Sequence, residues 1–160
     1  MSSNGKTIVH NAVILLAKGY DEGFVGRCVG NLREAGIRTH LVSLKSKSVT
    51  SWHGVEIQAD MLLRHWELAG NIRLVVVPGR RECVAALARE PMVPELVRDV
   101  LAHDGQLAVA HSAESLLEKY QQTLPADMSI LPKGITEEHY LPQGQERDDD
   151  FIKLLIKQIR

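Results

Sequence analysis

The sequence predicts an α/β fold with a mostly parallel sheet and helices on both faces. Strand-length apolar segments alternate along the chain with segments of helical periodicity. The strand segments are apolar almost throughout, which is typical of parallel strands buried on both faces. At 160 residues, the chain is long enough for one domain with its own hydrophobic core.

The first half of the chain begins with a strand expected over 12–17. A helix expected over 21–35 follows it, with apolar residues at helical spacing, and Gly36 ends this helix as a C′ glycine. The elements expected next are a second strand over 38–44, a short hairpin over 49–59 and a brief helix over 61–68.

The second half begins with the most apolar strand of the chain. In order, we expect a strand over 74–77, helices over 81–89 and 91–103, a strand over 107–110, a helix to Tyr120, a further strand over 128–131, a loop over 133–147 and a helix from Asp148. We therefore predict a flexible N-terminal lead over 1–11 and a single domain over 12–160 that ends in a C-terminal helix.

Charge and composition exclude several classes of function. The net charge of −1 gives no reason to expect nucleic acid or an anionic membrane as a partner. The apolar runs are of strand length, and the N-terminus lacks the apolar region of a signal peptide. The seven histidines do not occur at metal-ligand spacing, so we expect no metal and no cofactor. Two cysteines fit a reducing cytosol, which predicts a cytoplasmic location.

The segment 106–117 predicts an abrupt turn from strand to helix. An apolar strand candidate, 107–110, is followed after His111 by a helical pattern. Such a turn holds one side chain at the top of a parallel sheet, with N–H groups of the new helix directed toward it. These turns usually carry a nucleophilic Ser or Cys, whereas the residue at the tip here is His111.

Several blocks of sequence occur in a characteristic order. They are 12–19, Asp21-Glu22, 32–37, 51–60, 74–79, 94–98 and the strand-to-helix turn. Together they resemble the ThiJ/PfpI family, which includes the parkinsonism-linked deglycase and belongs to the class I glutamine amidotransferase-like superfamily. The resemblance covers residues 12–124 and implies a flavodoxin-like sandwich.

The chain departs from this family at the positions that carry its chemistry. The resemblance places the family's nucleophilic Cys at His111 and its acidic Glu at Phe24. The glycine that helps to form the oxyanion hole falls at Arg80, and the residue after the nucleophile is Ser112. The resemblance therefore implies that no catalytic residue of the family is retained.

Loss of the thiol together with the carboxyl is chemically coherent. The carboxyl tunes the acidity and position of the sulfur, and without the sulfur a buried acid only costs desolvation energy. We interpret the loss of both groups as the loss of catalytic function at this site. The protein would then be non-catalytic and bind a partner or a small anionic ligand. The alternative is a divergent hydrolase, deglycase or glyoxalase-like enzyme that uses His111 or another group.

His111 also has a structural interpretation. The family holds the tip residue at positive φ, and His is among the non-glycine residues enriched there. A catalytic dyad with Ser112 would need about 2.6–3.2 Å between heavy atoms, whereas adjacent side chains at such a turn normally diverge. We therefore expect a positive φ at His111.

Two arginines follow the strand over 74–77 at the same sheet edge as His111. One hypothesis is an anion site formed by Arg80, Arg81, His111 and the helix amides at Ser112. The alternative is that both arginines lie in solvent, partly balanced by Glu82.

Glycines and cysteines give two further expectations. Gly23, Gly26 and Gly30 weaken the first helix, and close contact in a homodimer would explain them, because family members commonly dimerise near this helix. Tight packing on the chain's own sheet is the alternative. Cys28 is expected in the core, whereas a partly exposed Cys83 would allow a third hypothesis, a redox-sensing module.

Overall fold

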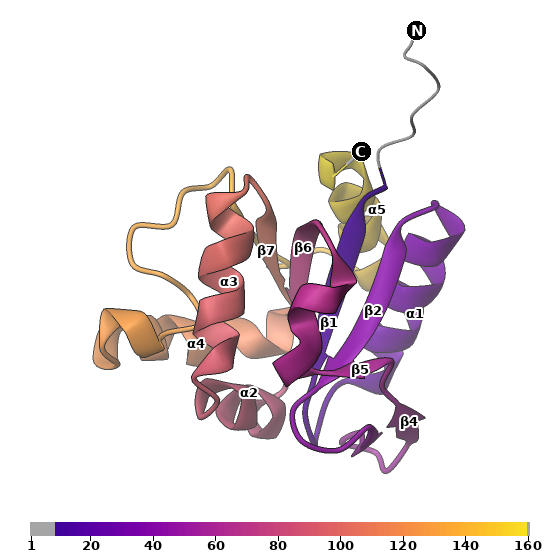
Figure 1. The fold of residues 1–160 in the computed structure, drawn as a ribbon, viewed down its shortest axis with the longest axis horizontal. Coiled ribbons are helices and arrows are strands. Elements are labelled where there is room, and N and C mark those ends of the chain that lie inside the picture. The colour runs from indigo at the N-terminus through magenta and orange to yellow at the C-terminus, as the bar shows by residue number, and fades with distance from the viewer. Residues whose placement is uncertain (1–8, 160) are drawn as a thin grey trace, which may run out of the picture.

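The computed structural model describes residues 9–159 and shows a sheet between two layers of helices (Figure 1). The order of strands in the six-stranded sheet is β5-β2-β1-β6-β7-β8, and every neighbouring pair is parallel. The strands are β1 (Asn11–Leu16), β2 (Arg38–Ser43), β5 (Met61–Leu62), β6 (Ile72–Val77), β7 (Gln106–Val109) and β8 (Tyr140–Pro142). This architecture confirms the predicted flavodoxin-like α/β sandwich.

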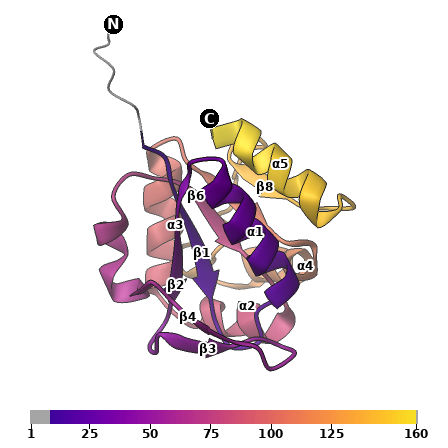
Figure 2. The same ribbon diagram turned by 90° about the vertical axis from the view of Figure 1, so that its right-hand side faces the viewer.

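Five α-helices are present among the described residues. They are α1 (Glu22–Glu34), α2 (Arg81–Ala88), α3 (Met92–Ala102), α4 (His111–Thr123) and α5 (Asp148–Ile159). α1 and α5 pack together on one face of the sheet, and α3 covers the other face (Figures 1 and 2). The predicted stop at Gly36 is confirmed, since Gly36 has a φ of +83° directly after the helix C-cap.

The core lies on both sides of the central strands. All six residues of β1 are buried, as are the last four of β6 and the last three of β7. Strands with no exposed face can form only where helices cover both sides of the sheet, so the apolar pattern and the layer order have the same cause.

The chain reverses its direction of travel across the sheet beside β1. From β1 it proceeds outward to β2 and β5, and it then returns to β6, on the other side of β1, before continuing to β7 and β8. In open α/β sheets, ligands bind in the crevice outside the carboxyl ends of the strands near such a switch point. The loops that matter for function are therefore those after β1, β2, β6, β7 and β8.

A short hairpin lies outside the main sheet, as predicted. β3 (Ser48–Thr50) and β4 (Glu56–Gln58) pair antiparallel around the turn that contains Gly54. The helix expected over 61–68 was only partly right: the segment begins as the edge strand β5 and continues as a 3₁₀ helix, Leu63–Ala69. The backbone of Met61 and Leu62 pairs with β2, which takes these two residues out of the helix.

The prediction was wrong after α4. The segment 128–131 forms no strand, and a short 3₁₀ helix covers Ala126–Met128. The strand lies instead at Tyr140–Pro142, inside the segment expected to be a loop. β8 contains Pro142, which is tolerated because β8 is the last strand of the sheet, where a residue without an N–H leaves no ladder bond unmade.

Strand β1 begins at Asn11, the last residue of the predicted N-terminal lead. Most of that lead, residues 1–8, lies outside the described residues. Over residues 9–159, no helix is long and apolar enough to span a membrane.

Candidate functional site

The abrupt turn predicted around His111 is present in the structure. β7 ends at Val109, Ala110 takes an extended conformation with φ −64° and ψ 151° as the N-cap, and α4 begins at His111. The expected positive φ at His111 was wrong, because among the described non-glycine residues only Asp104 has one. Ala110 makes the change of direction with ordinary backbone angles, so His111 is already helical and needs no left-handed conformation.

Glycine is required on the opposite side of this turn. Gly79, after β6, has a φ of +58°, and a Cβ there would lie 3.0 Å from the backbone N of Ala113 and still closer to Ser112 Oγ. The loop after β6 therefore lies directly against the first turn of α4. This contact limits the space that a ligand would need beside the α4 amides.

His111 projects from the turn toward solvent. Its side chain is 63% exposed, and Nδ1 lies 3.7 Å from Oε2 of Glu114, one turn along the same helix. Glu114 in turn accepts a hydrogen bond from the backbone N–H of Gly144 at 2.7 Å. Within the described residues, no hydrogen bond joins the His111 ring to Ser112 Oγ, so the two do not form a Ser–His dyad.

Gln143 occupies the N-terminus of α4. Its Oε1 accepts a hydrogen bond from the backbone N–H of His111 at 2.8 Å. Its Nε2 donates to Asp148 Oδ1 at 2.7 Å and to the carbonyl oxygen of Glu146 at 3.0 Å, and the side chain is buried. The chain's own amide thus takes a position at which a helix N-terminus could otherwise receive a ligand oxygen.

The sequence analysis missed Gln143 because it belongs to the segment 133–147, interpreted as a loop. Nothing in the local pattern distinguishes it from Gln145, which is exposed. Glu114, by contrast, could have been found, since an acid three residues after a helix start is favoured by the helix dipole.

Phe24 forms the floor beneath the turn. Its ring is buried, with 1% of its surface exposed, and its centroid lies 6.2 Å from that of Phe151 on α5. Phe24 and His111 line the same cavity, of about 310 Å³. The cavity is lined by Asp21, Phe24, Arg80, Ala110, His111, Ser112, Gln143, Gly144, Gln145, Glu146 and Asp148. We call it the elbow pocket.

Arg80 and Arg81 do not act as a pair. Arg80 lines the elbow pocket, with its guanidinium carbon 3.3 Å from the ring centroid of Trp52 and its Nε 4.0 Å from Asp21 Oδ2. Arg81 is exposed and is not among the residues that line this pocket. The pocket thus brings together three of the four predicted ligand-binding residues: Arg80, His111 and Ser112.

Carboxylates outnumber cations around the elbow pocket. Asp21, Glu146 and Asp148 line it, against the single guanidinium of Arg80, and of these carboxylates Asp148 is paired with Arg27 at 3.3 Å. Glu114 adds a further carboxylate 3.7 Å from His111. The field in this pocket therefore does not favour a small anion.

A second polar cluster lies beside Arg80, on the hairpin and the first turn of α1. Glu22 Oε1 accepts hydrogen bonds from Ser51 Oγ at 3.1 Å and lies 2.9 Å from His53 Nδ1. Burial raises the pKa of Glu22, but hydrogen bonds from its own backbone N–H and Ser51, together with His53, outweigh this and hold the pKa below its ordinary value. Glu22 stands between the hydroxyl and the imidazole, so Ser51 has no histidine base.

Both cysteines are closed to solvent. Cys28 lies in the core as predicted, whereas the expected partial exposure of Cys83 was wrong, because its side chain is fully buried in α2. Burial raises the pKa of each thiol to about 12. A protonated, inaccessible thiol is inert toward oxidants, which removes the basis of the redox-sensing hypothesis.

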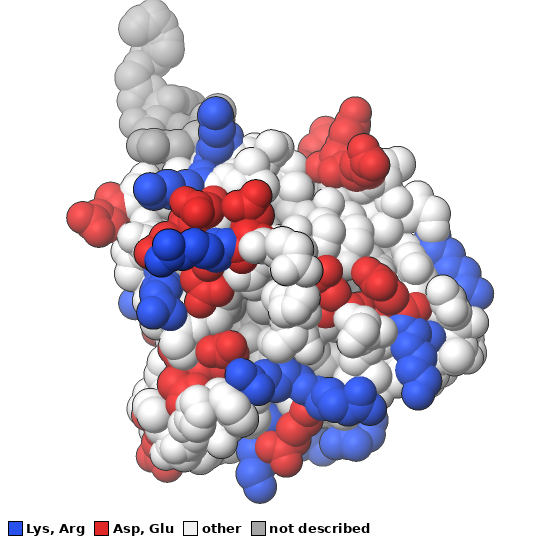
Figure 3. Space-filling view, turned by 180° about the vertical axis from the view of Figure 1, so that it is seen from behind, with Lys and Arg blue, Asp and Glu red and all other residues white. Residues whose placement is uncertain are grey.

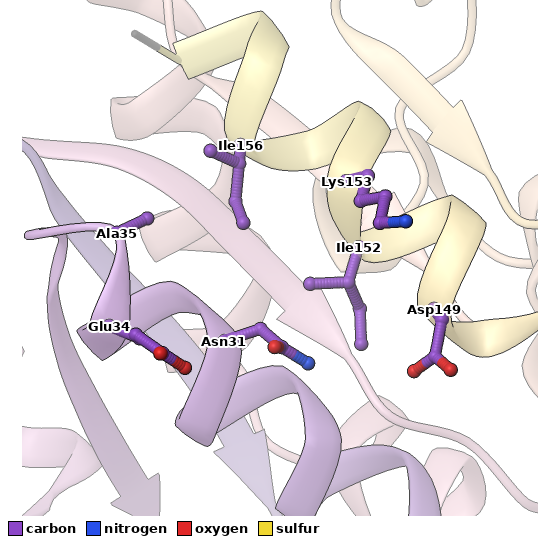
Figure 4. Close-up of a pocket in the computed structure, with 7 residues that line it drawn as sticks. All are labelled: Asn31, Glu34, Ala35, Asp149, Ile152, Lys153 and Ile156. Carbon is purple, nitrogen blue, oxygen red and sulfur yellow. The ribbon is translucent and has the colours of Figure 1, made fainter.

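A groove lies between α1 and α5 (Figure 4), which cover the face of the sheet opposite α3 (Figures 1 and 2). Ile152 and Ile156 of α5 lie along one side of it, and Asn31 and Glu34 of α1 along the other. On this face, acidic and basic side chains are interspersed, with uncharged surface between them (Figure 3).

Across residues 9–159, no group of three or more metal-ligating side chains is present.

The family can be assigned by comparison with known proteins. The model of the DJ-1/PfpI family matches residues 10–122, well over half of the chain. The chain belongs to the DJ-1/PfpI family. The match spans β1 through α4, so it includes the positions of Phe24, Arg80 and His111.

Solved structures of the DJ-1 superfamily share this fold at low sequence identity. DJ-1beta from Drosophila melanogaster superposes with a TM-score of 0.77 at 18% identity, covering 95% of this chain and 91% of its own. A cysteine-to-alanine mutant of a DJ-1 superfamily protein from Salmonella typhimurium gives 0.75 at 20% identity, covering 92% and 89%. Oxidized DJ-1 from Toxoplasma gondii gives 0.73 at 17% identity, covering 92% and 89%. No curated protein sequence matches the chain.

Proposed function

We propose that this DJ-1/PfpI protein is non-catalytic and acts by binding. The observation that carries the proposal is the tip of the elbow. The side chain there is an exposed imidazole, and its backbone N–H is already bonded to Gln143. Beneath it lies the buried ring of Phe24 rather than an acid. Thiol-based catalysis needs a cysteine with an activating partner, and the imidazole of His111 above the phenyl ring of Phe24 supplies neither, which supports the proposal.

Assays with methylglyoxal and with amide and ester substrates test the proposal. We expect no glyoxalase, deglycase or peptidase turnover above background. His111→Ala is the matched variant, because removing this exposed side chain leaves the backbone bond to Gln143 intact. Turnover in the native protein that disappears in His111→Ala would show instead a divergent enzyme that uses the imidazole.

Restoring only the thiol should not restore activity. In His111→Cys, the new sulfur would have Phe24 beneath it instead of a carboxyl, and Gln143 would still hold the first amide of α4. Addition of Phe24→Glu to His111→Cys supplies the missing acid and makes the comparison stepwise. Full activity in His111→Cys alone would contradict the proposal that the missing carboxyl also prevents catalysis at the elbow.

At the elbow pocket, a protein partner is favoured over a small anion. Asp21, Glu146 and Asp148 line the pocket, and the guanidinium of Arg80 already stacks on Trp52. Phosphate or sulfate should therefore leave the melting temperature unchanged at low ionic strength. A stabilisation by phosphate that Arg80→Ala abolishes would restore the anion as the ligand of this pocket.

A homodimer through α1 is the second part of the proposal. Gly23, Gly26 and Gly30 are exposed, and no heavy atom lies within 4 Å of a Cβ built at Gly26 or Gly30. Packing on the chain's own sheet therefore does not explain Gly26 or Gly30, which supports contact with a second copy. Two free, buried cysteines also support a cytosolic location.

Sedimentation analysis tests the dimer. A leucine at Gly26 or Gly30 should weaken self-association without unfolding the chain, because each position is open in the single chain. Ala102→Leu, at an exposed position on α3, is the matched control and should leave the dimer intact. A native protein that sediments as a monomer at all accessible concentrations would overturn this part of the proposal.

A further inference from the structure

A second cavity opens at the carboxyl edge of the sheet, on the other side of the switch point from the elbow pocket. Its volume is about 570 Å³, within the range of roughly 300–1,000 Å³ that is usual for small-molecule sites. Four segments line it: the ends of β1 and β2, strand β3 and the last turn of α2. We call it the switch crevice.

The floor of the switch crevice is apolar. Leu16, Ala17 and Val49 are buried side chains that line it, and Leu44 and Ala86 add half-buried apolar surface. Leu16, Ala17 and Val49 are already shielded from water and shape the floor, whereas Leu44 and Ala86 leave apolar surface that a ligand with a hydrophobic body would remove from water.

The rim of the switch crevice is cationic. Lys18, Lys45 and Arg89 line it with exposed side chains, against the single carboxylate of Glu90. Among the residues that the structure describes, no carboxylate lies within 4.0 Å of any of these three cations. They come from three different loops or helix ends, so their convergence is produced by the fold rather than by the local sequence.

Hydroxyl groups complete the wall. Ser46, Ser48 and Thr50 line the crevice between the cations and the apolar floor. Hydroxyls and flexible ammonium groups together can bind the oxygens of a carboxylate or phosphate. Arg89 also lies at the C-terminus of α2, where a cation is favoured by the helix dipole, so its effect on ligand affinity must be measured separately from its effect on stability.

We infer that the switch crevice binds a small amphipathic anion, with its apolar body against Leu44 and Ala86 and its carboxylate or phosphate among Lys18, Lys45 and Arg89. Position supports this assignment, since the crevice lies at the carboxyl ends of β1 and β2, beside the switch point between β1 and β6. The inference does not depend on whether the elbow is catalytic, so the enzyme assays and the titrations below can fail independently.

Three probes with one apolar body and different charges test the inference. Naphthalene-2-carboxylate, 2-naphthylmethanol and 2-naphthylmethylammonium are titrated separately into the full chain, and backbone amide shifts are followed by NMR. We expect affinity to fall in that order, with the shifts of the carboxylate confined to residues 16–18, 44–50 and 86–90. Equal affinity for the carboxylate and the ammonium probe, or shifts centred on residues 110–113, would overturn the inference.

Charge variants test the rim. Lys45→Gln and Arg89→Gln should each weaken binding of the carboxylate about threefold, as expected for one exposed charge pair, and should leave the alcohol unaffected. Arg64→Gln removes an exposed cation that does not line the crevice, and it should change neither affinity. An equal loss of affinity in all three variants would mean that only the net charge of the protein matters, which contradicts specific binding in the crevice.

A filling variant tests the floor. Ala86→Leu places three further carbon atoms at a lining position and should abolish binding of both the carboxylate and the alcohol. Ala85→Leu is the matched control on the same helix, because Ala85 is also half-buried but does not line the crevice. Thermal melts serve to check that both variants are folded. Undiminished binding to a folded Ala86→Leu variant would overturn the inference, whatever the charge variants show.

Discussion

The elbow pocket and the switch crevice lie at the same edge of the sheet but differ in how their polar groups are satisfied. In the elbow pocket, the first N–H of α4 is bonded to Gln143, and the guanidinium of Arg80 stacks on Trp52, although its Nε, 4.0 Å from Asp21, has no hydrogen-bond partner among the described residues. In the switch crevice, none of the lining cations has a carboxylate within 4.0 Å among the described residues.

This difference shows that an abrupt strand-to-helix turn does not by itself make a working site. The elbow geometry is intact, yet the side chain of Gln143 already bonds the first N–H of α4, where a ligand oxygen could otherwise bind. A helix N-terminus attracts negative charge only as long as its N–H groups remain free. The crevice has no special turn, but three charged groups there remain available to a ligand.

Changes at Phe24 should have the largest effect. Phe24→Ala removes a fully buried ring from its contact with Phe151, and we expect it to lower the free energy of unfolding by about 3–5 kcal/mol. Chemical denaturation measures this loss. Leu68→Ala, at an exposed apolar position, serves as the control and should change stability by less than about 0.5 kcal/mol. A small cost at Phe24 would mean that the elbow floor is not part of the core.

The buried thiols should make stability fall at alkaline pH. Burial raises the pKa of Cys28 and Cys83 from about 9.0 to about 12, so above pH 9 the unfolded chain releases protons that the folded chain retains. The contribution is fully present below pH 9 and is lost as the pH rises toward 12, at up to about 1.4 kcal/mol per pH unit for each thiol. Denaturation at increasing pH measures this slope, and Cys83→Ala should make it shallower.

Thiol labelling tests whether the two cysteines are inaccessible in the folded protein. Since Cys28 and Cys83 are fully buried, neither should react with a thiol reagent until the chain unfolds. Rapid reaction of Cys83 in the folded protein would instead show that the packing around α2 opens. The redox-sensing hypothesis would then have to be tested again.

Loss of the Gln143 side chain should have a smaller effect. Gln143→Ala leaves the first N–H of α4 and Oδ1 of Asp148 without their partner, while Oδ2 of Asp148 keeps its ion pair with Arg27, and we expect a loss of about 1–2 kcal/mol. Gln145→Ala, in the same loop at an exposed position, should be close to neutral. If Gln143→Ala is also neutral, water replaces the amide without cost, and the elbow is more open than the described contacts indicate.

The residue pattern was sufficient to predict the fold and the position of the strand-to-helix turn. The apolar strands, the helices between them and the start of α4 are local properties, because burial on both faces imposes continuous apolar strands and a helix imposes its own periodicity. The resemblance carried by scattered blocks was enough to predict the family, and the matched family model confirms it.

Which polar groups meet at the carboxyl edge of the sheet depends on the tertiary structure and could not be predicted from the sequence. Gln143 bonds His111 across 32 positions of the chain, and the cations of the switch crevice come from the ends of β1, β2 and α2. The same is true of β8, whose pairing tolerates Pro142 only because it is an edge strand, and of Cys83, whose burial depends on what covers α2. Sequence patterns report which face of an element is buried, whereas contacts between distant loops depend on the order and register of the strands that carry them.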